Sequence, residues 1–369
     1  LVHVPWVGHD GRSGLIPGSS GHPQPRLGLG VGNNYYDLVP FGGDDALATI
    51  YYFDALNLMA DIEREISRQP EWDIPTDEPP FSVDELTSLA DAVKAHAGQF
   101  FWNATTERFI GWQDIEGTRY DYGFVFVNNE AVAYGFATAQ QARQIYDWLD
   151  GKRIVDGDTS QGSDIYRWRF APRVTTVRNT QYYVWPWSAP QSIPWGDQIQ
   201  DGGAVLGFSY YDLIARLKTN SADDAWHRLQ AITTWFREPP GGLGMDQEFM
   251  ESVLVPQVML YGFLGLEARA GGLHLNPQLP SDWPGLTVTN IRYGDHVLDV
   301  TATSNSMRFT SRVAATEPIQ LWLNPSRWTM TTADANGNIT HEEDVGSVTP
   351  LVFKPTNGQT YILKDKTKQ

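Results

Sequence analysis

Carboxylates set among aromatic and glycine residues are the side chains of this chain best placed to do chemistry. Asp37 lies in the stretch GNNYYDLVPFGG, behind Tyr35 and Tyr36 and ahead of Leu38. An apolar, aromatic setting disfavours the charged form of a carboxyl and raises its pKa, so the group keeps a proton near neutral pH. Such a group can act as a general acid. The alternative is an aspartate that caps a helix or closes an Asx turn.

Acidic residues also gather around a second glycine-rich stretch, REPPGGLGMDQEFMES. Glu248 and Glu251 are three positions apart, so on a helix both project near one another. A helix N-terminus favours the charged form of a carboxylate, which suits a general base. The alternative is that Glu248 only complements the helix dipole. We rank Glu248 before Glu251 and Asp246, and Glu238 is a further candidate for the base.

Aromatic and acidic side chains outside these two stretches are candidates for binding the substrate. Asp121 in RYDYGF can bind a hydroxyl or end a hairpin, and Glu130 in VNNEAVAYG can line a cleft or cap a helix. Tryptophans flanked by Pro, Ser and Gly suit the apolar face of a sugar ring, because they combine an apolar body with a polar tip. Packing between helices is the alternative for these candidates, Trp185, Trp187 and Trp195.

The composition excludes several classes of function. The 369 residues carry a formal net charge of −17, with no basic stripe, which disfavours binding to nucleic acid or anionic lipid. Without cysteine, neither a thiolate nucleophile nor a Cys-ligated metal is available. The eight histidines lack metal-binding spacing, so we expect no metal and no cofactor. No stretch is long and apolar enough for a membrane span. Separately, we expect an extracytoplasmic location before a cytoplasmic one.

Hydrophobic periodicity divides the chain into a helical part and a β part. Ser82 with Glu85 is a capping-box signature. From about residue 271 the pattern alternates with period two between turn signals, which predicts strands. We therefore expect an α+β multidomain chain with a boundary near 271. Apolar residues recur at helical spacing over 44–66, 82–101, 129–149, 203–218, 221–236 and 247–266.

Long helices joined by irregular aromatic loops suggest a ring of helical hairpins, an (α/α) toroid whose loops form a cleft at one end. We expect 1–43 to contribute cleft loops, 44–270 to form a partial catalytic barrel and 271–369 to form an antiparallel β-sandwich. Six helices are half of such a barrel, and half a toroid leaves a broad apolar face open. We therefore expect the chain to be the C-terminal part of a larger protein, with the missing half of the barrel in the same protein or in another chain.

Several stretches resemble, in family order, the clan of trehalases and processing α-glucosidases. NNYYDLVPFGGDDALATIYYFDALNLMADI resembles its E-S-G-W-D signature and following helix, and FFWNATTERFIGWQDIEGTRYDYG resembles its lWn…DYD segment. PWGDQIQDGGAVLGFSYYDLIARL is similar to the signature QWDxPxGWxP, and GGLGMDQEFMESVLVPQVMLYGFL to the loop and last helix. The stretch GLHLNPQLPSDWPGLTVTNIRYGDHVLDV is similar to the β-sandwich of related phosphorylases and rhamnosidases.

The resemblance implies a six-hairpin, (α/α)6-barrel glycoside hydrolase that inverts the anomeric centre. Asp37 matches the general acid, Tyr36 stands where the family has tryptophan, and Asp201 aligns with a substrate-binding aspartate. The family's base is a glutamate on the loop before the last helix. It corresponds to Glu238, Glu248 or Glu251, or lies outside this chain. Inverting hydrolysis needs two carboxyls roughly 6.5–9.5 Å apart, with a water between them.

Other functions stay open beside hydrolysis of a neutral oligosaccharide or polysaccharide. A glycoside phosphorylase would use phosphate in place of water, and the arginines of 167–173 would mark it. A non-catalytic carbohydrate-binding or assembly module is favoured by Asn33, Asn34 and Tyr35, which depart from the family's residues ahead of the acid. A polysaccharide lyase is disfavoured, because its usual acidic polymer would be repelled by this acidic chain.

Overall fold

The chain folds into two compact units, each with its own hydrophobic core. The first comprises Leu1–Ala60, Phe81–Thr219 and Arg228–Ser252, and the second comprises Asp61–Pro80, Asn220–His227 and Val253–Gln369. The structure is a computed structural model that describes residues 1–4, 15–17, 23–25, 43–74, 81–114, 117–178, 194–199, 201–238, 253–324, 326–346 and 350–368.

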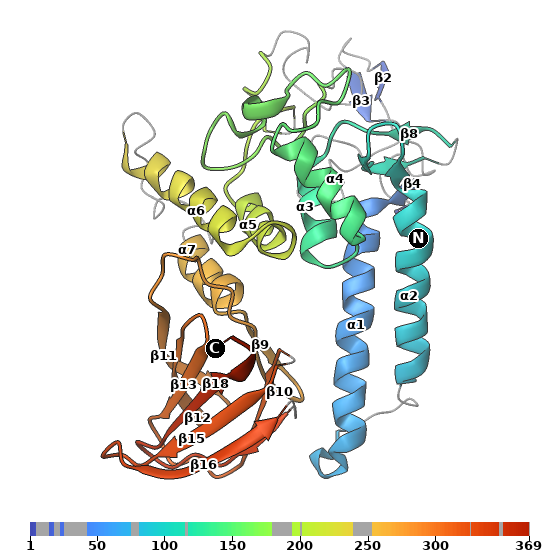
Figure 1. Cartoon of the computed structure of the whole chain (residues 1–369). Helices are drawn as coiled ribbons and strands as arrows, with labels where there is room; N and C mark the ends of the chain where they lie inside the picture. Colours follow the sequence, from blue (N-terminus) through green and yellow to red (C-terminus); the bar gives the residue numbers. More distant parts are fainter. Residues whose placement is uncertain are drawn as a thin grey trace. The chain divides into compact units, whose positions relative to one another are not determined.

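Most of the described helices lie in the first unit (Figure 1). The helices that build or enter it are α1 Ala46–Arg68, α2 Val83–Phe100, α3 Val125–Ala133, α4 Ala139–Leu149, α5 Phe208–Thr219 and α6 Ala222–Arg237, with a short 3-10 turn at Gly162–Tyr166, whereas the 3-10 turn Pro70–Trp72 belongs to the second unit. The strands of the first unit are antiparallel and short. One sheet has the order β1 Val2–Val4, β4 Gly43–Asp45, β7 Trp112–Gln113 and β8 Arg119–Tyr120. Two further pairs are β5 Trp102–Asn103 with β6 Arg108–Phe109, and β2 Leu15–Pro17 with β3 Pro23–Pro25.

The prediction of a single helix over 129–149 is wrong, because two helices occupy this stretch. Gly135 follows α3 with a φ of 72°, a left-handed conformation that glycine adopts without strain and that ends helices. Thr138 then starts α4, where its side chain and that of Gln141 form a reciprocal capping box. Because α3 begins before residue 129, Glu130 lies in the middle of a helix and not in a first turn.

Other predicted helices agree more closely with the structure. The helices expected over 44–66 and 82–101 correspond to α1 and α2, and Ser82 accepts a hydrogen bond from the backbone of Glu85 as an N-cap should. The helix expected from residue 203 begins only at Phe208, because the Gly203 carbonyl accepts a hydrogen bond from Val174. In the described part of 247–266, the helix α7 Leu254–Gln257 continues as the π-helix Val258–Phe263.

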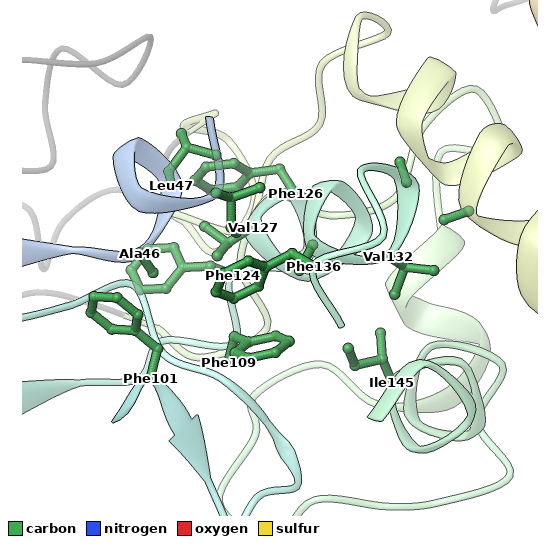
Figure 2. Close-up of a cluster of buried hydrophobic side chains, with 14 of the residues drawn as sticks. Ala46, Leu47, Phe101, Phe109, Phe124, Phe126, Val127, Val132, Phe136 and Ile145 are labelled. Carbon is green, nitrogen blue, oxygen red and sulfur yellow. The ribbon is translucent and has the colours of Figure 1, made fainter. Parts of the chain in front are cut away.

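Aromatic side chains form the centre of the first core (Figure 2). The rings of Phe109 and Phe136 lie 5.7 Å apart, and Trp102 meets Phe109 edge-on at 5.0 Å, an arrangement that aromatic pairs prefer. Every residue of α3 is buried. The helix therefore runs through the interior of the unit, and its polar members must find partners there.

A β-sandwich forms the second unit, as the alternation in the sequence predicted. Its six-stranded antiparallel sheet has the order β11 Leu286–Tyr293, β12 His296–Ala302, β13 Ser306–Ser311, β18 Thr360–Asp365, β15 Trp328–Ala333 and β16 Ile339–Gly346. The second sheet has the order β17 Leu351–Phe353, β14 Ile319–Leu323, β10 Gly272–Leu275 and β9 Leu266–Arg269, with β10 and β14 parallel. The prediction of an antiparallel sandwich is wrong for this pair, because β11–β13 of the other sheet come between the two strands in the chain and β14 returns in the direction of β10. Alternate residues of β12 and β14 are buried between the sheets.

The structure establishes an α+β chain, while the ring of helical hairpins and the limits 1–43, 44–270 and 271–369 remain predictions. Among the residues that the structure describes, no helix is long and apolar enough to cross a membrane. Within the same described ranges, no three His, Asp or Glu side chains come together as ligands for a metal ion.

Candidate functional site: a buried carboxyl with three tyrosines

Glu130 of α3 has the most unusual surroundings among the described carboxyls predicted to bind substrate. It exposes 1% of its surface, and Tyr51 of α1 is hydrogen-bonded to its carboxyl. The other oxygen, Oε2, is buried and has no hydrogen-bond partner in the part of the chain that the structure describes. Burial raises the pKa of Glu130 to about 7, although the Tyr51 hydrogen bond acts in the opposite direction. Near neutral pH this carboxyl can either give or take a proton.

Three tyrosines from three elements surround this carboxyl. The hydroxyls of Tyr134, which follows α3, and Tyr211 of α5 lie 3.0 Å apart. The Tyr134 ring packs edge-on against Tyr51 at 5.6 Å. Burial raises the pKa of all three phenols, so they stay neutral hydrogen-bond donors over the physiological pH range. We call Glu130, Tyr51, Tyr134 and Tyr211 the carboxyl–tyrosine cluster, and Tyr51, which is 42% exposed, connects it with solvent.

A buried ion-pair network fixes the helix that carries Tyr211. The next residue, Asp212, is fully buried and accepts hydrogen bonds from Arg216 Nε at 3.0 Å and Arg228 Nε at 3.1 Å. The Tyr166 hydroxyl lies 3.0 Å from the same carboxylate, and both guanidinium groups pack over the Tyr166 ring. Asp150 lies 2.9 Å from Arg216 and supplies a second anion, so two cations are balanced by two carboxylates, and the shared ring holds the cations in place.

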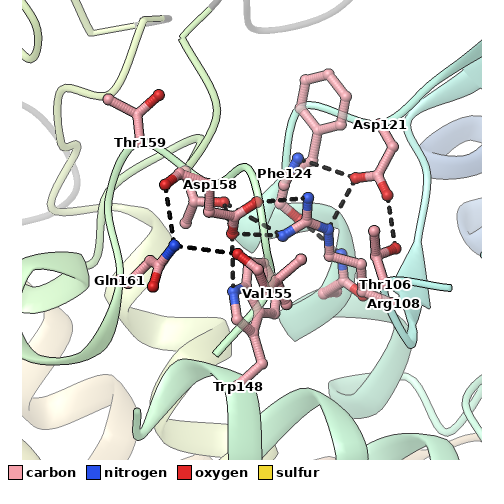
Figure 3. Close-up of polar contacts among 12 residues, drawn as sticks. Thr106, Arg108, Asp121, Phe124, Trp148, Val155, Asp158, Thr159 and Gln161 are labelled. Carbon is pink, nitrogen blue, oxygen red and sulfur yellow. Dashed lines mark hydrogen bonds and ion pairs between the residues drawn. The ribbon is translucent and has the colours of Figure 1, made fainter. Parts of the chain in front are cut away.

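Asp121, another predicted substrate-binding residue, belongs to a second buried network (Figure 3). Its carboxylate accepts hydrogen bonds from Arg108 Nε at 2.8 Å and from the Thr106 hydroxyl at 2.7 Å. Arg108 also holds both oxygens of Asp158, at 2.7 and 3.0 Å, and lies over the ring of Trp148. Since these protein partners occupy the carboxylate of Asp121, the geometry favours a structural role, and its sugar contact remains an untested prediction.

Trp195, predicted as a sugar platform, is half-buried beside a third arginine. Arg173 lies between two indole rings, 4.7 Å from that of Trp168 and 5.3 Å from that of Trp195. Trp195 also donates a hydrogen bond to Ser160, at 2.8 Å. Asp164 pairs with Arg173 at 3.0 Å. One face of Trp195 is therefore covered by a cation, and stacking on a sugar would use the other.

Two further predicted residues lie in the described ranges. Asp201 is 3% exposed, and its carboxylate is 3.9 Å from Arg178. Glu238 is exposed after the end of α6, where it pairs with Arg169 at 3.2 Å. The structure does not bring Asp201 or Glu238 into a contact with Glu130 that would define a catalytic pair. The remaining predicted residues lie outside the described ranges: Tyr36, Asp37, Trp185, Trp187, Asp246, Glu248 and Glu251.

Glu130 was predicted from the sequence as a substrate-binding residue, but its tyrosine partners were not predicted. One signal was present, because Tyr134 follows Glu130 by four residues, which is the spacing of neighbours on a helix surface. Tyr51 and Tyr211 come from helices far apart in the sequence, and only tertiary packing brings them to Glu130. Burial of α3 on all sides was likewise hidden, since its apolar residues show no clear stripe.

Comparison with known proteins gives one family for part of the chain. Residues 266–329 match the family described as "Glycosyl hydrolase family 65, C-terminal domain". This stretch begins at β9 and ends in β15, so it belongs to the β-sandwich. The match relates the second unit to the C-terminal domains of carbohydrate-active enzymes. No curated protein matches the sequence significantly.

Two solved structures have a low similarity to the chain. One is described as a kojibiose phosphorylase from the human microbiome, with 17% identity over 40% of this chain and 19% of that chain, and a TM-score of 0.27. The other is an α-L-rhamnosidase from Dictyoglumus thermophilum, with 13% identity over 86% of this chain and 31% of that chain, and a TM-score of 0.35. The chain therefore spans less than a third of the length of either protein.

The raised pKa of Glu130 predicts a pH-dependent stability. The folded-state pKa of about 7 exceeds the ordinary value of 4.5, so the contribution of Glu130 is fully present below pH 4.5 and is lost as the pH rises through 7. Relative to Glu130→Gln, the wild-type free energy of unfolding should fall by about 3 kcal/mol over this interval. Denaturation of both proteins at several pH values measures the difference. Exposed Glu85→Gln is the matched control, and a pH-independent difference for Glu130→Gln would contradict the prediction.

Proposed function

We propose that this chain is part of an enzyme that cleaves a glycosidic bond in a neutral oligosaccharide or polysaccharide. The observation that carries the proposal is the match of residues 266–329 to the C-terminal domain of glycosyl hydrolase family 65. The net charge of −17 supports a neutral substrate over a polyanionic one. The missing half of the predicted barrel, in the same protein or another chain, is the partner that would complete the cleft.

The proposed reaction is inverting hydrolysis by two carboxyls. Asp37 gives its proton to the glycosidic oxygen as the bond to the anomeric carbon breaks. A carboxylate at Glu238, Glu248 or Glu251 takes a proton from the water that attacks that carbon from the opposite face. The products are two sugars with a free hydroxyl on each side of the broken bond, and the enzyme returns to its starting state after one proton exchange with solvent.

The carboxyl–tyrosine cluster supports this proposal as a substrate-binding surface. Tyr51 is partly exposed and neutral, so its ring can pack on a sugar while its hydroxyl stays bonded to Glu130. The buried carboxyl then orients the phenol and does not itself need to reach the sugar. Among the residues that the structure describes, Glu130 is the alternative to Asp37 as the general acid, because its pKa lies near neutrality.

Phosphorolysis on the same fold is the second candidate reaction. It requires cations that converge on a phosphate, and the arginines of 167–173 were the candidates. Arg173 is paired with Asp164 and Arg169 with Glu238, at 3.0 and 3.2 Å. These ion pairs favour water over phosphate as the attacking group, since each would have to be broken or shared.

The test is sugar release from a panel of neutral oligosaccharides, with and without inorganic phosphate. We expect release that does not need phosphate, with a fall of at least ~100-fold in kcat for Asp37→Asn. Glu130→Gln and Tyr51→Phe should mainly raise KM, because they disturb binding and leave the acid in place.

Each other outcome selects a different function. A loss of kcat in Glu130→Gln with normal kcat in Asp37→Asn would make Glu130 the acid. Release that requires phosphate and yields a sugar phosphate would replace hydrolysis by phosphorolysis. Sugar binding without release in any condition would leave a non-catalytic carbohydrate-binding module and overturn the proposed reaction.

A further inference from the structure

The β-sandwich contains a pocket of about 530 Å³ that is separate from every residue discussed above as a candidate for catalysis or substrate binding. Its walls come from the β12–β13 turn and from the segments that follow β10, β14 and β18, all within the second unit. Its volume lies in the range of roughly 300–1,000 Å³ that is usual for small-molecule sites.

Hydroxyl and amide side chains make up about half of the residues in the wall of this pocket. No Lys or Arg is among the described residues that line it, so nothing there would hold an anion. Asp365 is the single carboxylate among them, which is too few ligands for a hard metal ion. A ligand with many neutral hydroxyls matches the wall best, and the polar lining includes Gln278, Thr303, Asn305, Ser306, Asn324 and Thr367.

Asp365 ties together the segments that form the wall. It is 3% exposed and accepts hydrogen bonds from the Ser326 hydroxyl at 2.5 Å and the Thr367 hydroxyl at 2.6 Å. Its backbone N–H donates to the carbonyl of Asn305 at 2.9 Å. The Asp365 carboxylate thus fixes Ser326 and Thr367, and its backbone N–H fixes Asn305, so the pocket is preformed and a ligand need not order its walls.

Two amides of the pocket are available to a ligand. In the part of the chain that the structure describes, neither the Gln278 side chain nor the Asn305 Nδ2 has a hydrogen-bond partner. Leu275, Met307 and Trp328 supply apolar groups that belong at the same time to the sandwich core. An apolar base with amide donors and acceptors around it suits a sugar ring, which has C–H faces and a rim of hydroxyls.

We propose that this pocket is a sugar-binding site of the β-sandwich, for a neutral mono- or disaccharide, and that it lies outside the reaction centre. The inference goes beyond the proposed bond cleavage and does not require it. A site of this kind would hold the polymer or its product on the enzyme and would add its affinity to that of the cleft.

Calorimetric titration with glucose, galactose, mannose and maltose tests the proposal, with galacturonate and inorganic phosphate as charged comparisons. We expect one neutral sugar to bind with a Kd of about 1 mM. The variant Gln278→Ala/Asn305→Ala should weaken it at least ~10-fold, because two hydrogen bonds of about 1 kcal/mol each are lost. Gln99→Ala, an exposed amide of α2, should bind as the wild type does.

A local reporter distinguishes this pocket from the cleft. The chain has no cysteine, so Ser304→Cys at the exposed rim carries an environment-sensitive dye at one position. A sugar-dependent signal from this dye supports the proposal even where sugar release is absent. The proposal is overturned by a dye that does not respond to any of the sugars, by unchanged affinity in the double variant, or by preference for the charged ligands.

Discussion

Replacing Arg108 with methionine is expected to lower the free energy of unfolding by about 3–5 kcal/mol. The side chain is 1% exposed and pairs with two carboxylates, Asp158 at 2.7 Å and Asp121 at 2.8 Å. Methionine keeps the apolar stem of arginine but has no guanidinium, so two largely buried carboxylates lose their cation and Trp148 loses the group that lies over its ring. Chemical denaturation followed by far-ultraviolet circular dichroism measures the loss.

Two variants show that the loss comes from the buried charges. Arg143→Met changes an exposed arginine of α4 and should alter stability by no more than about 0.5 kcal/mol. Asp158→Asn in the Arg108→Met background removes one uncompensated anion. The double variant should therefore lose less free energy of unfolding than the two single variants lose together. If the losses of the two single variants were strictly additive, or if Arg108→Met lost as little stability as Arg143→Met, the loss would not come from uncompensated buried charges.

Asp212→Asn is expected to cost about 3 kcal/mol or more, because asparagine keeps the shape of the site and removes its charge. In the part of the chain that the structure describes, Arg228 then has no ion-pair partner, while Arg216 keeps Asp150 at 2.9 Å. Tyr211 stands next to Asp212 on α5, so we also expect a disturbed contact between its hydroxyl and Tyr134. Nuclear magnetic resonance of the tyrosine rings, together with denaturation, measures both effects.

The matched control for Asp212 is an exposed aspartate. Asp147 of α4 lies 3.8 Å from Lys152, and both side chains are more than half exposed. Asp147→Asn should therefore change the free energy of unfolding by less than about 1 kcal/mol. If Asp212→Asn were equally mild, the two arginines would have to be held by the Tyr166 ring and the surrounding backbone carbonyls instead of by the carboxylate.

Part of the fold followed directly from local sequence patterns. The period-two alternation after residue 271 predicted the β-sandwich, since a strand with one buried face must alternate. The long apolar stripe and the Ser82 cap predicted α1 and α2. The break between α3 and α4 was missed, because apolar residues continue on both sides of Gly135 and the pattern alone does not report a left-handed turn.

The candidate site could be predicted only one residue at a time. Glu130 was named from its sequence context, yet its burial and the unpaired Oε2 follow from packing on every side of α3. The sequence suggested that Asp121 and Trp195 face a sugar, which stays a prediction, and it did not reveal Arg108 and Arg173, which the fold gives them as partners. The sequence does not say which group will pair with a polar side chain, because that partner comes from a distant segment that only the fold brings close.

By itself, the sequence determined most of the element types, the acidic net charge that disfavours polyanionic partners, and the set of carboxyls that are candidates for chemistry. Those properties are local or additive, so they are readable without coordinates. Only the tertiary structure decided which carboxyl is buried enough to hold a proton near neutral pH, which arginines are consumed by ion pairs, and where the β-sandwich has a preformed polar pocket. These depend on desolvation and on contacts between residues far apart in the chain, and neither is encoded in any short stretch.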